Sequence, residues 1–324
     1  MAHRHYSDLE IVEAAALNTD RGIWAIKLSL LILVATAVLQ AGVVAYSGSV
    51  ALLADTIHNV ADAFTALPLW IAFALSRRHA TRRFTYGYDR AEDIAGVLIV
   101  LIIVASAFVA GYESYLRLIH VEGPRHLEWA MGAALIGFMG NEAVALYRIK
   151  VGREIGSAAL VADGQHARID GLTSLAALAG LLGVSRGYPM ADPLAGLLIT
   201  VAIFFIAYKA GREILARLMD AIDPQMVEDI ERVALEVQGV RLVHDIRARW
   251  VGHQIYMEIH ISVDGHLSVI EGHRRAEEVC HELLHHIPRL SGIVVHVDPV
   301  EKIGESYHGL TAHHFRGASP PEVS

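Results

Sequence analysis

Six long apolar stretches dominate this sequence and restrict the folds that it can adopt. Each is long enough to cross a hydrocarbon core of about 30 Å, which takes about 20 helical residues. They occupy about residues 23–46, 49–75, 92–115, 127–147, 157–184 and 192–214. Because backbone polar groups in lipid must be satisfied internally, the pattern predicts an all-α, six-helix transmembrane domain at residues 22–219.

The composition supports a membrane protein and excludes other classes. Hydrophobic residues make up 54% of the chain, and the single cysteine, Cys280, rules out an intrachain disulfide and a cysteine-rich zinc knuckle. The net charge is -8, and the segment after residue 220 contains 12 of the 19 histidines. We find no basic patch for nucleic acid, whereas an acidic, histidine-rich segment attracts cations.

The distribution of Lys and Arg over short loops and helix ends predicts the orientation of the chain. One side carries Arg77, Arg78, Arg82, Arg83, Arg90, Arg148, Lys150, Arg153, Lys209, Arg212 and Arg217. The other side carries only Arg117, Arg125 and Arg186. We therefore expect a multi-pass protein of the cell (inner) membrane with both termini in the cytoplasm, and a cytoplasmic N-terminal segment at residues 1–21 without a secretory signal.

The motif A-D-x-x-H-x-x-x-D occurs twice within apolar segments, at residues 54–62 and 162–170. On a helix, positions four apart share a face, so His58 with Asp62 and His166 with Asp170 each direct one nitrogen and one oxygen ligand to one side. The two helices together offer two nitrogens and two oxygens, a set that suits tetrahedral Zn2+. A local hydrogen bond within each pair is the alternative, but ionisable groups at membrane depth are costly and usually functional.

The predicted orientation makes the two motif helices antiparallel. His58 and His166 each lie about nine residues, or roughly 14 Å, from opposite membrane surfaces, so both fall near the midplane. Asp55 and Asp163 lie one turn away, on opposite sides, where ions could be attracted; helix capping or a bond to a neighbouring helix is the alternative for both. Arg168 falls on the other face of its helix and has no firm explanation beyond a pair with Glu142.

A soluble domain is predicted at residues 220–303. A helix begins at Asp223-Pro224, and two strand-like stretches follow at residues 241–251 and 254–263, the second with alternating apolar residues. A helix at about residues 268–287 and a strand at residues 292–297 complete the order αββαβ. The polar tail at residues 304–324 is expected to be disordered.

Several motifs together resemble the cation diffusion facilitator family, zinc-transporting branch, over about residues 23–300. Besides the two H-x-x-x-D pairs, they are Gly48-Ser49-Val50, Tyr86-Gly87-Tyr88, Arg90-Ala91-Glu92, Ala191-Asp192-Pro193 and Val243-His244-Asp245-Ile246. The resemblance implies a homodimeric transporter that exports Zn2+ from the cytoplasm in exchange for protons, with a ferredoxin-like cytoplasmic domain. His58, Asp62, His166 and Asp170 would be its transport ligands.

The resemblance also implies roles for residues of the soluble domain. A regulatory metal site at the dimer interface would be formed by His244, His260, His273, His296 and Asp298. Arg90 and Asp220 match the family's charge lock. The remaining histidines of this region have no matched role, and we expect them to be exposed: His253, His266, His281, His285, His286, His308, His313 and His314.

The function that these observations favour is divalent cation efflux by alternating access, with Zn2+ as both transported and regulatory ion. Metal binding requires deprotonated ligands, so the same residues could couple export to proton entry. Cd2+, Co2+ and Fe2+ remain open as further substrates, and an enzyme is not expected. Two alternatives are a membrane metallohydrolase, which needs an open zinc position that four protein ligands do not leave, and a membrane-anchored metal sensor.

Overall fold

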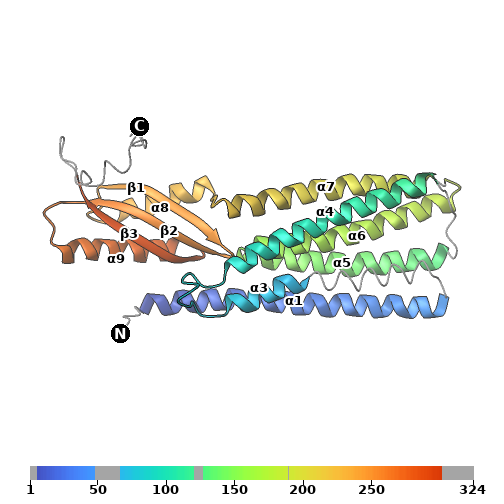
Figure 1. Ribbon diagram of the computed structural model, residues 1–324, viewed down its shortest axis with the longest axis horizontal. Helices are drawn as coiled ribbons and strands as arrows, with labels where there is room; N and C mark the ends of the chain where they lie inside the picture. The colour runs from blue at the N-terminus through green and yellow to red at the C-terminus, as the bar shows by residue number, and fades with distance from the viewer. Residues whose placement is uncertain (1–5, 48–65, 120–126, 189, 301–324) are drawn as a thin grey trace. The chain divides into compact units, whose positions relative to one another are not determined.

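The computed structural model describes residues 6–47, 66–119, 127–188 and 190–300. The chain divides into two compact units (Figure 1). The helical unit comprises Met1–Ala221 and Trp250–Gln254. The sheet unit comprises Ile222–Arg249 and Ile255–Ser324. Five residues from the middle of the soluble domain therefore pack with the helices.

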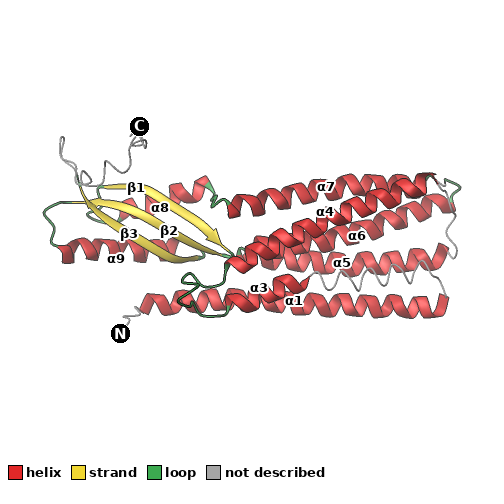
Figure 2. Cartoon of the chain, viewed as in Figure 1, coloured by secondary structure: helices red, strands yellow, loops and turns green. Residues whose placement is uncertain are grey.

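Long helices running side by side form the helical unit (Figure 2). They are α1 (Tyr6–Ser47), α3 (Leu67–Ser76), α4 (Arg90–Ile119), α5 (Leu127–Ile155), α6 (Ala158–Ser185) and α7 (Ala191–Leu218). Each of them contributes to one apolar core, through residues such as Ile26, Phe73, Ile99, Ile155, Ile169 and Ile203. The N-terminal segment at residues 1–21 is helical from Tyr6 onward and continuous with the first apolar stretch.

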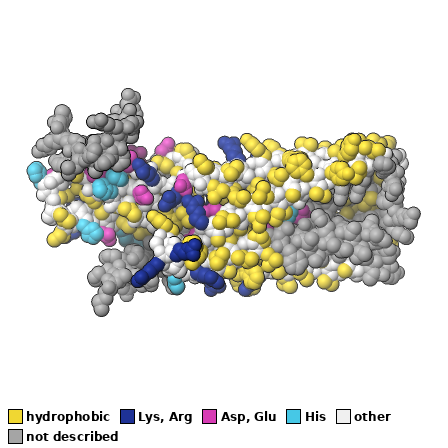
Figure 3. All heavy atoms as spheres, viewed as in Figure 1, with side chains coloured by type: hydrophobic (Ala, Val, Ile, Leu, Met, Phe, Trp, Pro, Cys, Tyr) yellow, Lys and Arg dark blue, Asp and Glu magenta, His cyan; other side chains and the backbone are white. Residues whose placement is uncertain are grey.

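Within the described residues, four helical stretches are long and apolar enough to cross a membrane. They are Ala16–Gly42, Arg90–Leu116, Ala158–Ser185 and Pro193–Leu218. Large apolar side chains such as Leu31, Leu198 and Val201 are exposed on these helices, and Figure 3 shows hydrophobic side chains over the outside of this unit. Such a surface is stable against lipid, and contiguous patches of this kind are rare on soluble monomers.

A sharp turn joins α5 to α6 and sets them antiparallel. Gly156 has φ of 80°, a conformation that favours glycine, and the hydroxyl of Ser157 then accepts a hydrogen bond from Leu160 N at 2.9 Å. Beyond the turn the two helices approach closely at Gly164, where an added Cβ would lie 2.9 Å from Ile149 N. This close packing fixes the position of the second A-D-x-x-H-x-x-x-D motif against α5.

The sheet unit has the predicted order αββαβ. It consists of α8 (Pro224–Glu236), β1 (Leu242–Val251), β2 (Gln254–Val263), α9 (Val269–His286) and β3 (Leu290–Pro299). The strand order is β1-β2-β3, and β2 pairs with β3 in parallel, with His260 opposite His296 and Ser262 opposite Asp298. Parallel pairing requires a crossover, which α9 provides.

One face of the sheet forms the core of this unit with α8 and α9. The residues of β2 that alternate inward, including Ile255, Ile259 and Ile261, are fully buried, as are Ile230 of α8 and Leu283 of α9. The intervening residues of β2, including Tyr256, Glu258 and His260, are intermediate or exposed. The histidines of the strands therefore lie on the face opposite the two helices.

Candidate metal centres

The α6 half of the intramembrane set lies in the buried part of the helical unit. His166 Nε2 is 3.9 Å from Asp170 Oδ2, one turn along the helix, and both side chains are at least nine-tenths buried. An imidazole and a carboxylate on one face of a helix are the ligand types of tetrahedral zinc, which takes four ligands. The other half, His58 and Asp62, and the neighbouring Asp55 lie outside the described residues.

Asp163 forms a buried ion pair one turn before His166. Its Oδ2 lies 2.8 Å from Nη1 of Arg148 on α5, and both side chains are almost completely buried. Of the two interpretations left open for Asp163, this contact supports a bond to a neighbouring helix. A buried charge requires a partner, and Arg148 supplies one.

Two other polar contacts join helices within this unit. Arg168 Nη2 donates to Glu142 Oε1 at 2.8 Å, so the suggested pair between α6 and α5 is formed. Gln40 of α1 is buried and donates through Nε2 to the carbonyl of Ala133 on α5 at 3.3 Å. Gln40 and Glu142 therefore each take part in a bond between two helices.

The residues matched to the charge lock are in contact at the start of α4. Arg90 Nη2 donates to Asp220 Oδ1 at 2.9 Å, and Arg90 Nη1 lies 3.5 Å from Asp93 Oδ2. Arg90 begins α4, and Asp220 follows α7 at a φ of 58°. Both side chains of the pair are 40% or more exposed, so the contact contributes orientation and little stability.

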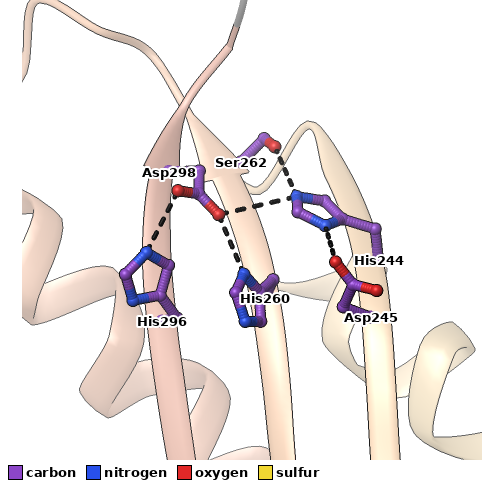
Figure 4. Close-up of polar contacts among 6 residues, drawn as sticks. All are labelled: His244, Asp245, His260, Ser262, His296 and Asp298. Carbon is purple, nitrogen blue, oxygen red and sulfur yellow. Dashed lines mark hydrogen bonds and ion pairs between the residues drawn. The ribbon is translucent and has the colours of Figure 1, made fainter. Parts of the chain in front are cut away.

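Three strands bring four of the five predicted cytoplasmic ligands together (Figure 4). Asp298 lies at the centre: its Oδ2 is 3.1 Å from His260 Nδ1 and 3.6 Å from His244 Nε2, and its Oδ1 is 3.1 Å from His296 Nε2. The parallel register places His260 beside His296, with ring centroids 4.6 Å apart. We call His244, His260, His296 and Asp298 the sheet cluster.

The chemistry of the sheet cluster fits zinc. Imidazole nitrogens and a carboxylate oxygen are zinc ligands, and the ligand atoms of His260, His296 and Asp298 all lie within 4.8 Å of one another. Asp298 is buried while the imidazoles remain partly exposed, so the cluster combines an anchored carboxylate with access from solvent. Ser262 Oγ lies 3.4 Å from His244 Nε2 and helps to hold that ring.

The sheet cluster differs from the predicted ligand set at two positions. Asp245 also lies close, with Oδ2 3.5 Å from His244 Nδ1, and it forms a second possible donor group with His244 and His260. Strand alternation would place Asp245 on the other face, but its φ of 50° interrupts the alternation, which the sequence did not reveal. His273, in contrast, is exposed on α9 and belongs to neither donor group found among the described residues of the chain.

Among the described histidines expected to be exposed, His253 is the exception, whereas His308, His313 and His314 lie outside the described residues. His253 is fully buried in the helical unit, where its Nδ1 lies 2.8 Å from Glu92 Oε2 and its ring lies against Phe73, with centroids 5.9 Å apart. Next to it, Gly252 N donates to Asp93 Oδ2 at 3.1 Å. A two-residue hairpin turn is normally solvated, so no sequence signal indicated this burial.

Asp89 completes the acidic surroundings of the turn. Burial raises the pKa of its carboxyl, an effect that the nearby His253 and a hydrogen bond from Ser76 oppose. Gly252 also approaches Asp89, because a Cβ at this glycine would lie 2.8 Å from the Asp89 carbonyl oxygen. The hairpin turn Gly252-His253 thus packs against acidic residues at the start of α4.

Comparison with known proteins decides between the possible classes. Residues 26–219 match the family model for the cation efflux transmembrane domain, and residues 222–300 match that for the cytoplasmic domain of cation efflux proteins. The chain belongs to the cation diffusion facilitator family. Members of this family are transporters, so the protein is a membrane cation efflux transporter and the expectation that it is no enzyme is confirmed.

Relatives within the cation diffusion facilitator family are named for different cargoes. The chain is 51% identical over 284 residues to the probable cation efflux system protein Rv2025c of Mycobacterium tuberculosis (strain ATCC 25618 / H37Rv), covering 88% of this chain and 86% of that protein. It is 29% identical over 285 residues to the manganese efflux system protein MneP of Bacillus subtilis (strain 168), covering 84% and 95%. It is also 29% identical over 255 residues to the magnetosome protein MamB of Magnetospira sp. (strain QH-2), covering 78% and 87%.

A solved structure of the MamM CTD in a cadmium form is also similar to this chain. It is 32% identical, covers 24% of this chain and 98% of its own, and gives a TM-score of 0.24.

Proposed function

We propose that this cation efflux transporter exports Zn2+ from the cytoplasm in exchange for protons. The observation that carries the proposal is the buried pair His166 and Asp170 on α6, together with the same spacing at His58 and Asp62 in the other motif. Four ligands of this kind close a tetrahedral shell around a transported divalent ion. They also leave no open position for the water of a hydrolase.

The ligand types favour Zn2+ over Mn2+. Two imidazoles suit Zn2+, Cu2+, Fe2+ and Ni2+, whereas Mn2+ prefers carboxylate, carbonyl and water oxygens. Efflux of Mn2+ is nevertheless a second candidate function, because the relative MneP is named a manganese efflux protein. Cd2+, Co2+ and Fe2+ belong in the same comparison of substrates.

The proposed transport domain has six membrane-crossing helices with both termini in the cytoplasm. The four apolar stretches found among the described helices support it, as does α5, whose Arg148 and Glu142 are neutralised by partners on α6. The remaining crossing is proposed for residues 49–75, which extend into α3. The inner membrane of the cell is the proposed location.

Proton coupling is proposed to use the transport ligands themselves. Zn2+ binds only deprotonated imidazole and carboxylate, so loading the site releases protons and protonating it releases the ion. If the loaded site opens to one side and the protonated site to the other, exchange follows from alternating access. Asp55 is proposed to attract ions on one access path, whereas Asp163 acts through its pair with Arg148.

The sheet unit is proposed to be a ferredoxin-like regulatory domain that mediates homodimer formation. The sheet cluster would hold regulatory Zn2+, and His273 would join it from a second copy, since one chain does not bring this residue to the cluster. A bound ion would supply a cross-link that favours one arrangement of the two copies. Arg90 and Asp220 are proposed to act as the charge lock, consistent with their 2.9 Å contact.

The test is ion flux in proteoliposomes under an imposed pH gradient. Native protein is compared with Asp62→Ala and Asp170→Ala, and each is offered Zn2+, Mn2+, Cd2+, Co2+ and Fe2+ in turn. We expect gradient-dependent Zn2+ flux in the native protein and its loss in both variants. Thr173→Ala on the same helix is the matched control, because its hydroxyl donates to the Ile169 carbonyl of its own turn.

Each alternative has a distinct outcome in this assay. If the native protein preferred Mn2+ and both variants lost Mn2+ flux, the intramembrane site would stand, but the transported ion would be Mn2+ and not Zn2+. Flux of Zn2+ that persists in Asp62→Ala and Asp170→Ala would refute the intramembrane assignment. Absence of flux for every ion, with metal binding intact at the sheet cluster, would favour the sensor.

A further inference from the structure

A third pair of potential ligands with helical spacing lies outside both sites described above. His281 and His285 are four residues apart on α9, in the run His281-Glu282-Leu283-Leu284-His285. Their ring centroids are 4.4 Å apart in an edge-to-face arrangement, and both side chains are exposed. Leu283, between them in sequence, is fully buried and anchors this turn of α9 to the core.

Two neighbouring imidazoles on one helix face are a preformed bidentate set. The helix holds their Cα atoms one turn apart, so little conformational freedom is lost when both bind one ion. Glu278 and Glu282 lie on the same face, and their carboxylates add negative charge that attracts a cation. Glu278 is 40% exposed and contacts Arg275 at 2.6 Å, so it lies beside the pair without blocking it.

The spacing H-E-x-x-H also occurs in zinc peptidases, where the glutamate is the general base. Those enzymes need a third protein ligand, and the donor groups of three or more found in the described part of this chain are both in the sheet. The α9 pair therefore offers two protein ligands, and water would fill the remaining positions. Binding, not hydrolysis, is the activity that this geometry supports.

The α9 pair is separated from the sheet cluster by the sheet itself. The ligands of the sheet cluster come from β1, β2 and β3 (Figure 4). Because side chains alternate along a strand, His260 lies on the face opposite the buried side that packs against α8 and α9. The fully buried side chains of Ile259 on β2 and Leu283 on α9 belong to the core between the sheet and the helices. A single ion cannot contact both sets.

We propose that His281 and His285 form a separate cytoplasmic metal site for a divalent ion that prefers imidazole, with Cu2+ bound more tightly than Ni2+ or Zn2+. The order follows the Irving–Williams series for nitrogen ligands. This inference does not rest on zinc antiport, because it depends only on the geometry of α9.

The probe is Cu2+, added to the full-length protein in detergent and followed by electron paramagnetic resonance, with Zn2+ followed by calorimetry. We expect His281→Ala and His285→Ala each to remove one Cu2+ per chain and its nitrogen hyperfine signal. The matched control is His286→Ala: this exposed histidine adjoins the pair, but its Nδ1 is held 2.8 Å from the Glu282 carbonyl, and we expect no loss. Because all three side chains are exposed, the thermal midpoints should be unchanged.

Measuring Cu2+ binding in the His260→Ala variant distinguishes the α9 pair from the sheet cluster. His260→Ala removes a member of both donor groups in the sheet, and the further loss caused by His281→Ala should persist in it. Unchanged Cu2+ binding in the double variant His281→Ala/His285→Ala would overturn the proposal. So would an equal loss in His286→Ala, or a signal that already disappears in His260→Ala. Zn2+ flux is measured separately, so failure of the transport proposal leaves the binding result intact.

Discussion

At the residue scale, the helical unit contains charges that are stable only as pairs. Arg148 and Asp163 are both almost completely buried, and their 2.8 Å contact joins α5 to the motif helix. Removing one charge of a buried pair leaves the other without compensation, which costs about 3–5 kcal/mol, whereas replacing both with apolar residues is often neutral. The pair should therefore matter more for folding of this region than for ion attraction.

We predict that Arg148→Met strongly lowers the thermal midpoint in detergent, by an amount equivalent to about 3–5 kcal/mol. The double variant Arg148→Met/Asp163→Leu should recover most of this loss, because no buried charge is left unpaired. Arg232→Met is the control, since its partner Asp229 is more than half exposed, and its midpoint should not change measurably. A double variant as unstable as the single one would contradict the ion-pair explanation.

At the element scale, much of the sheet unit could be predicted from local patterns. The alternation in β2 and the helix expected at about residues 268–287 agree with the observed bounds of β2 and α9 to within two residues, and a capping box of Ser268 and Glu271 begins α9. The sheet cluster was only partly predictable, because Asp245 joins it through a positive φ and His253 is buried by contacts with residues about 160 positions away. Such features depend on tertiary packing, which local sequence patterns do not record.

The contact between α5 and α6 gives a prediction at the same scale. In Gly164→Ala the new Cβ would lie 2.9 Å from Ile149 N and 3.0 Å from Arg148 Cβ, so the helices must separate. Overpacking of this kind costs about 1–3 kcal/mol. It would also shift His166 and Asp170, and we expect both a lower thermal midpoint and weaker ion flux.

Gly132→Ala is the matched control on α5, because nothing lies within 4 Å of its added Cβ. Alanine is the better helix former by about 1 kcal/mol, so this variant should be at least as stable as the native protein. Equal behaviour of the two variants would show that the close approach at Gly164 does not position the motif.

At the scale of the whole molecule, the chain returns to the helical unit after it has entered the soluble domain. Trp250–Gln254 pack with the helices, and Trp250 lies under the guanidinium of Arg217, 4.4 Å from its ring centroid. At the tip of the turn, His253 contacts Glu92 and Gly252 contacts Asp93. Both contacts are to carboxylates, so the turn packs against acidic side chains.

Asp89 makes the stability of the folded protein depend on pH. Its pKa is raised by burial, so the folded protein releases this proton at a higher pH than the unfolded chain, whose value is near 3.8. Between these two values the folded state binds more protons, and stability falls as the pH rises through the folded pKa. Above it, the folded protein holds a desolvated carboxylate, with a cost that Asn in its place would avoid.

We therefore predict that Asp89→Asn is more stable than the native protein near neutral pH, and that the difference disappears as the pH falls below 3.8, where Asp89 is protonated in both the folded and the unfolded chain. Thermal midpoints from about pH 3 to about pH 8 measure it, with Asp89→Glu as the variant that keeps a titratable carboxyl and hence a pH dependence. Two terms oppose the gain, since Asn loses the attraction of His253 and alters the bond from Ser76. If these two losses exceeded the desolvation cost that Asn avoids, Asp89→Asn would be less stable than the native protein at neutral pH. The surroundings of the turn would then be a favourable site for the Asp89 carboxylate.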